Sequence, residues 1–377
     1  MKISFISNVC GCSWAGSEEL WQGVAMEALS NGHKVLACVH SDLCKSSQIN
    51  DFKNAGGTVK TWLRGAVARF EGIRQKIHPN FSLDKLGRPD VVLVSAGALP
   101  AINYVPGLSR FLMETEIPFG ILCQFNSDSL AMAPRERQMT RNLLIKSSFQ
   151  IFVSQHNLNL AKRQFALELP KAEVIYNPIR TVLDAPLHIP DFQNGAAFGC
   201  VARFESLWKG QDLLVEILSK PLWTDRNWTL HLFGEGPDLE HVKAYTSLVG
   251  LGDRVFFNGY VRDLNKIWDK CHCMVLPSRG EGTPLAVLEA MMCGRPIVTT
   301  DVGGNAEIVE DGVTGWIAEA ATPSSFSRAM ERAWESRDRW EEMGRAAHHK
   351  AKQLSSLNPS AKLLEILQNF FMQTRAL

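Results

Sequence analysis

Residues 273–296 read CMVLPSRGEGTPLAVLEAMMCGRP, and they are the most informative segment of the 377-residue chain about its fold. Its first four residues, Cys273–Leu276, are an apolar run typical of a buried strand. A glycine-containing polar loop then leads into a predicted helix, with Thr283 as its N-cap and Pro284 as its first residue. The closing Gly-Arg-Pro ends that helix. A strand, a loop and a helix in this order predict a parallel sheet built from βαβ units.

The same alternation of short apolar strands and amphipathic helices runs through most of the chain. Strands are expected at residues 3–7, 34–39, 90–95, 119–123, 150–153, 198–202, 229–233, 254–257 and 296–299, and helices at 17–30, 210–219 and 239–247. Residues 179–196 are proline-rich and without periodicity, which predicts a linker. The fold class is therefore α/β, with two doubly wound domains, 1–178 and 197–357, that face each other across a cleft. An amphipathic helix at 358–374 is expected to pack back toward the first domain.

The composition excludes several broad classes of protein. Lys and Arg total 40 against 39 Asp and Glu, which argues against a protein dominated by nucleic-acid binding. Nine scattered cysteines, an odd number, indicate reduced side chains in a cytoplasmic protein rather than a disulfide framework. The first twelve residues turn polar too early for a signal peptide, and no run approaches the ~18 apolar residues of a membrane span. Cys10-x-Cys12 and Cys271-His272-Cys273 lack the spacing of a zinc site, so no metal site is expected.

The start of the helix after Cys273–Leu276 predicts an anion site. The first amides of a helix have no intrahelical acceptor, and here they lie beside Gly282 and Thr283, an arrangement that favours phosphate. Glu281 precedes the helix and Glu289 lies within it. A carboxylate accepts hydrogen bonds from two hydroxyl groups, which suits sugar recognition. The alternative is that both glutamates are ordinary surface acids.

Two cations follow another predicted strand. Arg203 comes directly after the strand at 198–202, and Lys209 is expected to open the next helix. Two cations at one strand end can bind a diphosphate. The alternative is a pair of solvated surface side chains.

Five motifs within residues 198–316 together resemble the retaining, nucleotide-sugar-dependent glycosyltransferases of the glycogen-synthase-like group, known as glycosyltransferase family 4. They are VARFESLWKG (201–210), LFGEGP (232–237), FFNGYV (256–261), PSRGEGTPLAVLEAMMCGRPIV (277–298) and VGGNAEIVEDGVTGW (302–316). The resemblance implies the GT-B fold, which consists of two Rossmann-like domains. It also implies that Arg203 and Lys209 neutralise the donor diphosphate, that Glu281 binds hydroxyls of the transferred sugar, and that Glu289 binds the ribose. The further donor contacts that it implies are Gly16, Gly234, Tyr260, Val261, Gly282, Thr283, Pro284 and Leu285.

The function implied by this resemblance is transfer of a sugar from a UDP- or GDP-sugar to a hydroxyl acceptor, a glycan or a lipid-linked sugar, with retention and without a metal. The setting implied is bacterial polysaccharide or glycolipid biosynthesis in the cytoplasm, at the inner face of the membrane if the protein binds lipid. No cofactor and no nucleic-acid partner are expected. The chain has no Asp-x-Asp pair, the motif that usually binds a divalent cation in the other main glycosyltransferase fold. The alternatives are a nucleotide-sugar epimerase or hydrolase of similar shape, or a non-catalytic subunit that binds sugar nucleotides. A dehydrogenase is disfavoured because the chain has no G-x-G-x-x-G fingerprint at its first loop.

The first half offers candidates for acceptor binding. Gln124, Asn126 and Asp128 follow the strand at 119–123, where many family members carry a histidine-containing motif, and His156 follows the strand at 150–153. Polar groups at strand ends suit hydroxyl binding. The alternatives are an ordinary turn for the first three and a place in the first helical turn for His156.

Two further features of the first half remain open. In the first loop, Gly16 approaches the donor by resemblance, although Ala15 replaces a commoner glycine, and Ser17 is expected to cap the following helix. The segment 60–76 interleaves arginines with apolar residues, which suits either a surface that meets lipid or an anionic acceptor, or a solvated helix face with core contacts.

Overall fold

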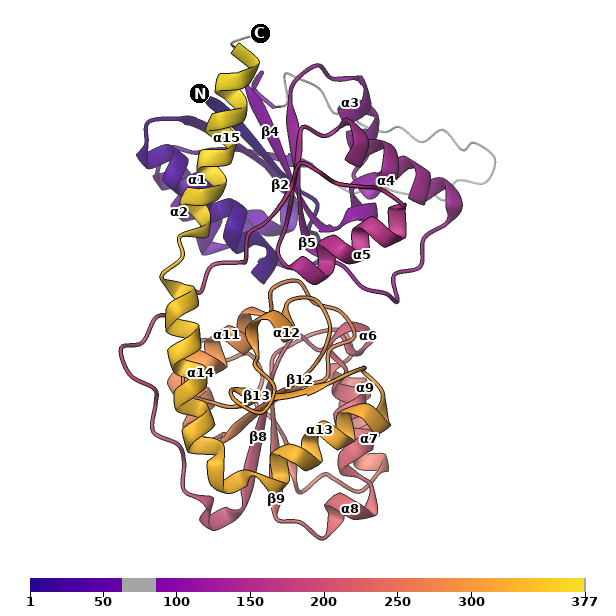
Figure 1. Ribbon diagram of the computed structural model, residues 1–377, viewed down its shortest axis with the longest axis vertical. Coiled ribbons are helices and arrows are strands. Elements are labelled where there is room, and N and C mark those ends of the chain that lie inside the picture. The colour runs from indigo at the N-terminus through magenta and orange to yellow at the C-terminus, as the bar shows by residue number, and fades with distance from the viewer. Residues whose placement is uncertain (63–85, 376–377) are drawn as a thin grey trace. The chain divides into compact units, whose positions relative to one another are not determined.

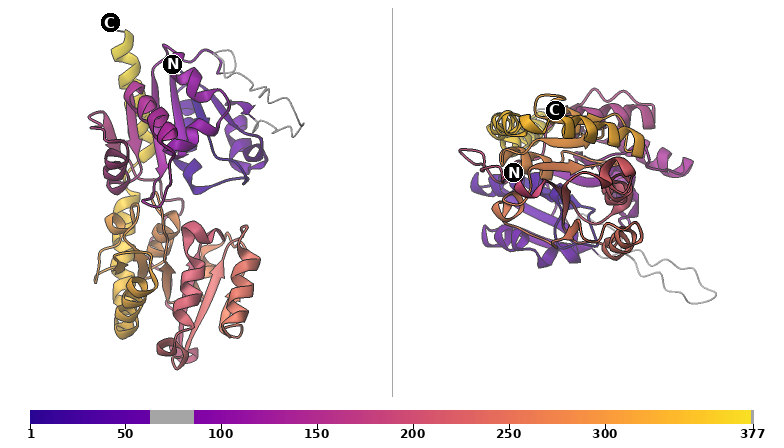
Figure 2. Two further views of the ribbon diagram at one scale, coloured as in Figure 1. Left: turned by 90° about the vertical axis from the view of Figure 1, so that its right-hand side faces the viewer. Right: turned by 90° about the horizontal axis from the view of Figure 1, so that it is seen from below.

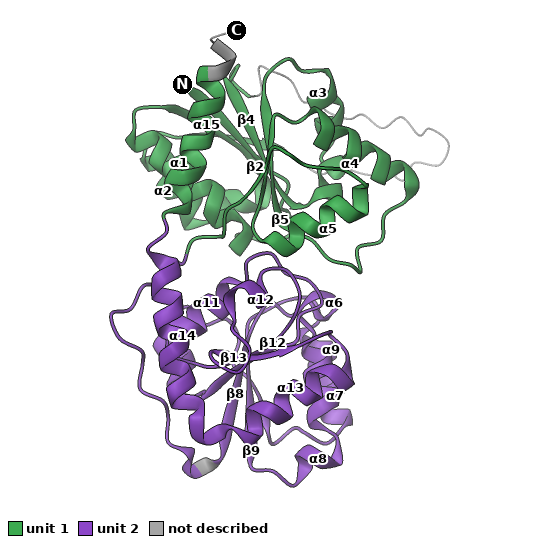
Figure 3. Ribbon diagram, viewed as in Figure 1, with its two compact units in different colours: residues 1–178, 358–377 green, residues 179–357 purple. Residues whose placement is uncertain are grey.

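The computed structural model of the protein describes residues 1–62 and 86–375, and it divides the chain into two compact units (Figure 3). Unit 1 comprises Met1–Pro178 and Asn358–Leu377, and unit 2 comprises Ile179–Leu357. Each unit contains one parallel sheet with helices packed on it, so the chain has the α/β class that the sequence pattern predicted. The basic segment 60–76 lies mostly outside the described residues. The hypothesis about its surface therefore also concerns residues that the structure does not describe.

Unit 1 has a seven-stranded sheet in the order β3-β2-β1-β4-β5-β6-β7, with every neighbouring pair parallel. The strands are β1 (Lys2–Ser7), β2 (Lys34–His40), β3 (Thr58–Trp62), β4 (Val91–Ala98), β5 (Phe119–Phe125), β6 (Phe149–Phe152) and β7 (Ala172–Val174). The α-helices are α1 (Glu19–Ser30), α2 (Ser47–Asn54), α3 (Leu108–Glu114), α4 (Pro134–Lys146), α5 (Gln155–Phe165) and α15 (Pro359–Arg375).

The central strands of unit 1 are apolar on both faces because helices cover both. Successive side chains point to opposite faces, so Leu93 joins the core beneath α1 while Val94 joins the core on the other side. The C-terminal helix α15 lies beside α1 (Figure 1), with Leu363 and Leu367 fully buried in the first of these cores. The end of the chain therefore contributes to the core of unit 1.

Unit 2 has a six-stranded parallel sheet in the order β10-β9-β8-β11-β12-β13. The strands are β8 (Ala196–Val201), β9 (Trp228–Phe233), β10 (Val255–Phe257), β11 (Cys273–Leu276), β12 (Ile297–Thr300) and β13 (Gly315–Ala318). The α-helices are α6 (Ser206–Lys209), α7 (Gln211–Leu218), α8 (Pro221–Thr224), α9 (Leu239–Leu248), α10 (Leu264–Trp268), α11 (Leu285–Met292), α12 (Asn305–Ile308), α13 (Pro323–Glu335) and α14 (Trp340–Ser355). Figure 2 shows these helices on both sides of the sheet.

The strand order of unit 2 locates its ligand site. The chain moves outward in one direction from β8 to β10 and in the other from β11 to β13, so the order reverses between β8 and β11. In open parallel sheets, ligands bind at the carboxyl ends of the two strands where this reversal occurs. The loops that leave β8 and β11 carry Arg203 and Glu281 respectively.

The sequence pattern missed three strands, β3, β7 and β13. All three lie at the edges of their sheets. In β3 and β7 much of the strand faces solvent, so the continuous apolar run that marks a central strand is missing. An edge strand pairs on one side only, and its hydrogen bonds to a neighbour leave little trace in the sequence.

Three details of the expected helix starts are wrong. Ser17 lies in a 3-10 turn at Gly16–Glu18, because extended backbone at Ala15 starts the turn early, and Glu18 is the N-cap of α1. Lys209 ends the short helix α6 rather than opening the next one, because Gly210 (φ 66°) interrupts the helical backbone. Pro284 rather than Thr283 is the N-cap of α11, because Pro284 has extended backbone (ψ 96°) and its carbonyl accepts the first helical hydrogen bonds.

The segment 179–196, expected as a linker, is bonded to unit 2. The backbone amide of Leu187 donates to the carbonyl of Cys293 (3.2 Å). The buried guanidinium of Arg295 donates to the carbonyls of Leu187 (3.1 Å) and His188 (2.7 Å).

Among the described residues, none of the helices combines the length and the apolar character needed to cross a bilayer.

Candidate functional site

The loops that leave β8 and β11 pack closely together because glycines replace side chains at the contacts. Gly210 has a positive φ of 66°, and a Cβ at this position would lie 2.3 Å from the carbonyl oxygen of Pro277. Gly303, also with positive φ, would place a Cβ 2.4 Å from the carbonyl oxygen of Glu281. No larger residue fits at either place without moving backbone. The backbone around Glu281 is therefore fixed from two sides, by α6 and by the loop before α12.

Lys209 and Glu281 are in direct contact. The Nζ of Lys209 lies 2.6 Å from Oε1 of Glu281, and the hydroxyl of Ser278 donates to the same oxygen at 2.6 Å. Glu281 is 7% exposed and Lys209 26% exposed in their side chains. The residues are 72 positions apart in the sequence, so the fold has placed a cation and a carboxylate together where β8 and β11 end. Ser278 belongs to the motif that the sequence singled out, but it was not assigned a role there.

A buried thiol lies near this pair. Burial raises the pKa of Cys200 to about 12, and the charges of Lys209 and Glu281 are close enough to act on it. A thiol with such a pKa remains protonated at neutral pH and is a poor nucleophile. Cys200 therefore serves the core beneath the site rather than its chemistry.

Arg203 and Glu289 lie on either side of this pair in the chain. Arg203 is half-exposed, its Nε lies 3.8 Å from Glu205, and its carbonyl accepts a hydrogen bond from Gln211 (2.8 Å). Glu289, in α11, is 14% exposed, and its Oε1 lies 3.2 Å from the Nε of Arg180. Sequence reasoning missed Arg180, whose one signal was a basic residue directly after the Tyr-Asn-Pro-Ile stretch.

The remaining donor candidates of unit 2 surround these loops. The amide of Gly234 donates to the carbonyl of Gly259 at 2.7 Å, which ties the loop after β9 to the segment that carries Tyr260 and Val261. Tyr260 is 69% exposed, whereas Val261 packs against the core. The carbonyl of Gly282 accepts from the amide of Gly304 (2.7 Å). Thr283, Pro284 and Leu285 are buried and lead into α11.

The candidates in unit 1 differ in their surroundings. Gln124 and Asn126 are both 3% exposed, and neither amide atom of Gln124 has a hydrogen-bond partner among the described residues. Asn126 accepts from the amide of Ser127 (2.9 Å), as expected of a turn, and Asp128 forms an ion pair with Arg163. His156 lies in the first turn of α5, for which the hydroxyl of Ser154 is the N-cap. Gly16 starts the 3-10 turn before α1.

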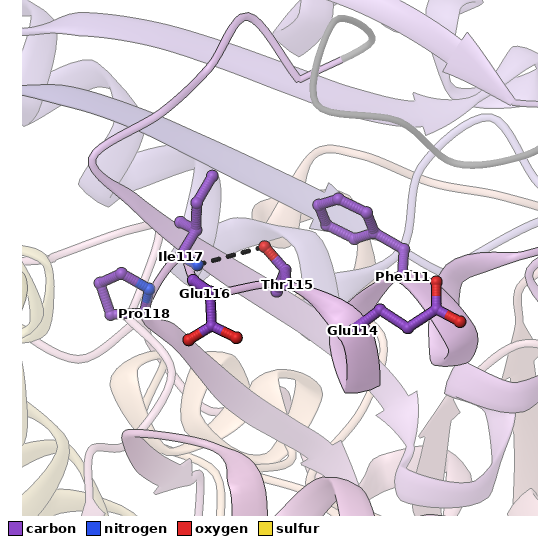
Figure 4. Close-up of a pocket in the computed structure, with 6 residues that line it drawn as sticks. All are labelled: Phe111, Glu114, Thr115, Glu116, Ile117 and Pro118. Atoms are coloured by element: carbon purple, nitrogen blue, oxygen red, sulfur yellow. Dashed lines mark hydrogen bonds between the residues drawn. The ribbon is translucent and has the colours of Figure 1, made fainter.

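A hollow of about 630 Å³ lies elsewhere on unit 1 (Figure 4). It is lined by Phe111, Glu114, Thr115, Glu116, Ile117 and Pro118, which connect the end of α3 to the start of β5. Within this group, the amide of Ile117 donates to the hydroxyl of Thr115 (3.2 Å). The hollow is at the amino end of β5, whereas ligands of parallel sheets bind at the carboxyl ends, so we assign it no part in the site.

Comparison with known proteins finds a family match over the part of the chain that carries these loops. Residues 195–336 match the family described as "Glycosyl transferases group 1". The chain is 29% identical over 158 residues to the lipopolysaccharide 1,6-galactosyltransferase of Escherichia coli K12, covering 41% of this chain and 43% of that protein. It is 36% identical over 139 residues to the lipopolysaccharide core biosynthesis mannosyltransferase LpcC of Rhizobium leguminosarum bv. viciae, covering 35% and 39%. The matches thus span less than half the length of these curated relatives.

Solved structures extend the likeness to the whole fold. The Anabaena Alr3699/HepE structure in complex with UDP-glucose has a TM-score of 0.72 over 98% of this chain and 100% of that one, at 18% identity. Sucrose-phosphate synthase from Thermosynechococcus elongatus has a TM-score of 0.68 over 100% of both chains, at 15% identity. The expected GT-B fold is confirmed. Residues 195–336, which match the group 1 family, include both strand-end loops described above.

Proposed function

We propose that the protein is a retaining glycosyltransferase that moves a sugar from a nucleotide diphosphate sugar to a hydroxyl acceptor, in the synthesis of bacterial lipopolysaccharide or a related surface glycan. The observation that carries the proposal is the contact between Lys209 and Glu281 at the strand ends of a group 1 domain. The relatives named as lipopolysaccharide galactosyl- and mannosyltransferases support the reaction and its setting. The Anabaena protein of the same fold, whose structure contains UDP-glucose, supports the nucleotide-sugar donor.

In this proposal, cationic side chains, carboxylates and the first turn of a helix bind the donor. Lys209 and Arg203 neutralise the diphosphate, assisted by the first amides of α11, which have no intrahelical acceptor. Glu281 accepts hydrogen bonds from hydroxyls of the transferred sugar, and Glu289 does the same for the ribose. Gly234, Tyr260 and Val261 lie near the base, and the backbone of residues 282–285 contacts sugar and phosphate.

The bond changes are those of a substitution at the anomeric carbon. The bond from that carbon to the phosphate oxygen breaks, and its electron pair leaves with the diphosphate. The acceptor oxygen bonds to the same face of the sugar, and its proton passes to the departing phosphate oxygen. Negative charge grows on the diphosphate as the bond breaks, so fixed cations stabilise the transition state more than the bound donor. These cations are side chains, and the proposal therefore requires neither a metal ion nor a cofactor.

The acceptor binds in unit 1 in this proposal, and the protein acts in the cytoplasm. Gln124 and Asn126 lie at the carboxyl end of β5, where amide groups can bind hydroxyls. Asp128 and His156 are weaker candidates, because Asp128 is paired with Arg163 and His156 occupies a helical turn. The acceptor in this proposal is a glycan or a lipid-linked sugar.

Two substitutions test the roles of Lys209 and Glu281 separately. We expect Lys209→Met to weaken binding of the cognate nucleoside diphosphate and to lower kcat by ~10²–10³-fold, because it removes a fixed cation from the leaving group. Glu281→Gln should lower kcat to a similar extent but leave nucleoside diphosphate affinity at or above the wild-type value, because its partner in the reaction is the sugar. Donor and nucleotide are identified beforehand by thermal shift with UDP, GDP, ADP and their sugar conjugates.

The matched control is Lys243→Met, since Lys243 forms an exposed ion pair with Glu240 on α9 and is not one of the proposed donor contacts. It should retain full transfer. Wild-type rates in folded Lys209→Met and Glu281→Gln variants would reject the site. Full turnover of the donor without any acceptor would instead favour an epimerase or hydrolase, and donor binding without turnover under all conditions a non-catalytic subunit.

A further inference from the structure

Arg279 lies in the loop between β11 and α11, two residues before Glu281, and the sequence resemblance assigned it no role. Its guanidinium donates two hydrogen bonds to the carboxylate of Asp212, at 2.9 and 3.0 Å. Asp212 lies in the first turn of α7. The two side chains are 28% and 33% exposed, so water screens this bidentate ion pair only in part.

The same arginine also bonds to α6, the helix that ends in Lys209. The backbone amide of Arg279 donates to the carbonyl of Trp208 (2.7 Å), and its guanidinium donates to the carbonyl of Ser206. A helix of four residues is too short to fix its own conformation through its internal hydrogen bonds. The place of α6 in the molecule therefore depends on neighbours such as Arg279.

These bonds join the two halves of the candidate site. One end of the connection is α6, with Lys209, and the other is the loop that holds Glu281, 2.6 Å away. The close approach of Gly210 to the carbonyl of Pro277 keeps the same two segments together at the backbone. A change at Arg279 or Asp212 would thus alter the distance between a cation and a carboxylate that both act on the donor.

We propose that Arg279 and Asp212 are positioning residues, which clamp α6 and α7 to the loop before α11 and thereby set Lys209 and Glu281 for the donor diphosphate and sugar. This inference rests on the function proposed above. Neither residue of the clamp contacts the substrate. The ligand that the clamp serves is a nucleoside diphosphate sugar.

The main alternative is that Arg279 is itself a ligand of the diphosphate. The two possibilities predict opposite effects of Asp212→Asn. If the pair is a clamp, this substitution loosens α6 and impairs the reaction. If Arg279 binds phosphate directly, the substitution frees the guanidinium from its carboxylate, so that affinity for the nucleoside diphosphate stays the same or rises.

The experiment measures kcat and the donor KM, together with the dissociation constant of UDP, GDP or ADP, whichever binds the wild-type chain most tightly. The variants are Asp212→Asn, Asp212→Glu, Arg279→Lys, Lys209→Met and the double variant Asp212→Asn with Lys209→Met. Arg332→Lys is the matched control, because Arg332 makes an equivalent bidentate ion pair with Asp311 and donates to the carbonyl of Ile317. Thermal unfolding of each variant checks that it is folded.

The clamp predicts that Asp212→Asn and Arg279→Lys each lower kcat by ~10- to 100-fold, since displacement of catalytic groups by about 1 Å has effects of this size. Asp212→Glu should recover part of the loss. In the Lys209→Met background, Asp212→Asn should lower kcat by a smaller factor than it does in the wild-type chain, because part of its effect acts through Lys209. Arg332→Lys should behave as wild type.

Three outcomes overturn the inference. Wild-type kcat in Asp212→Asn shows that the clamp is not needed, and if the nucleoside diphosphate also binds more tightly to this variant, Arg279 is assigned to the phosphate. Losses that multiply in the double variant show that Asp212 acts independently of Lys209. If the wild-type chain binds none of the nucleotides, the proposed function fails, and the clamp fails with it.

Discussion

Glu18 is a carboxyl group that the fold buries completely, at the end of the 3-10 turn before α1. The indole nitrogen of Trp21 donates to its Oε2 (2.9 Å), and the hydroxyl of Ser17 lies 3.4 Å from its Oε1. Burial raises the pKa of Glu18 from 4.5 to about 7, although these hydrogen bonds act in the opposite direction. The side chain is therefore close to half-ionised at neutral pH, in the loop that carries Gly16.

This pKa predicts how stability depends on pH. Between about 4.5 and 7 the folded state binds more protons at Glu18 than the unfolded state, so the contribution of Glu18 to stability falls as pH rises through this window. Above it, the ionised side chain costs about 3 kcal/mol. Glu18→Gln should therefore raise the denaturant midpoint of unit 1 relative to wild type at pH 8, with a much smaller difference at pH 5.

Denaturant unfolding at the two pH values measures this effect. Glu27→Gln is the control, since Glu27 lies in the same helix α1 but is partly exposed. Its effect should be small and equal at both pH values. An equal effect of Glu18→Gln at pH 5 and pH 8 would show that the carboxyl group is not held near neutrality.

Among single residues, the sequence predicted part of the candidate site. Lys209 and Glu281, which the structure brings into contact, were chosen because each follows an apolar strand in a distinctive motif, and parallel strands bring such positions to one edge. Arg279 and Asp212 were not found, since 67 residues separate them and an arginine on a loop is usually solvated. The sequence also cannot tell which of the neighbours Glu18 and Glu19 is buried, because both residues precede the same helix.

Among the elements of unit 2, the junction between α11 and β12 is held by Arg295, which is fully buried. Its guanidinium donates to six backbone carbonyls, those of Leu187, His188, Trp268, Cys271, Cys293 and Gly294. Burial lowers its pKa below the ordinary value of an arginine, although the side chain stays charged at any physiological pH. One side chain thus joins the segment before β8, the end of α10, the start of β11 and the end of α11.

Arg295→Met should destabilise unit 2 by about 3 kcal/mol or more, because it leaves several buried carbonyls without a donor. Arg295→Lys should recover little of this loss, since an ammonium group cannot reach carbonyls in so many directions. Chemical denaturation followed by tryptophan fluorescence measures the change. Arg345→Met, which removes an exposed pair with Glu341, should cost less than about 1 kcal/mol, and a similar small loss at Arg295 would contradict the prediction.

The sequence predicted strands and helices well where a buried apolar run is bounded by a residue that ends it, such as proline or glycine. The bounds of β11 were predicted without error, because an apolar run ends at a proline and both faces of the strand are buried. The edge strands β3, β7 and β13 were missed, whereas β10 was predicted. Helix starts shifted by one or two residues, because backbone conformation at Ala15, Gly210 and Pro284 decided them. Such conformations depend on neighbouring loops rather than on local residue preference.

For the molecule as a whole, the two units have separate cores, and the core of unit 2 is built from residues of unit 2 itself. The chain leaves unit 2 after α14 and returns to unit 1 as α15, so a fragment of residues 179–357 omits no part of the core of unit 2. We therefore predict that this fragment folds cooperatively and binds the cognate nucleoside diphosphate within about tenfold of the full chain, yet transfers no sugar.

Calorimetric titration of the fragment and of the full chain with the same nucleotide tests whether unit 2 alone binds the donor nucleotide. The fragment with Lys209→Met is the control, and it should lose binding to the same extent as the full-length variant. Because Gly16 of unit 1 is also a proposed donor contact, a modest loss of affinity in the fragment fits the proposal. A folded fragment without measurable binding, beside a full chain that binds, would mean that the donor site depends on unit 1, and that Lys209 and Glu281 alone do not define it.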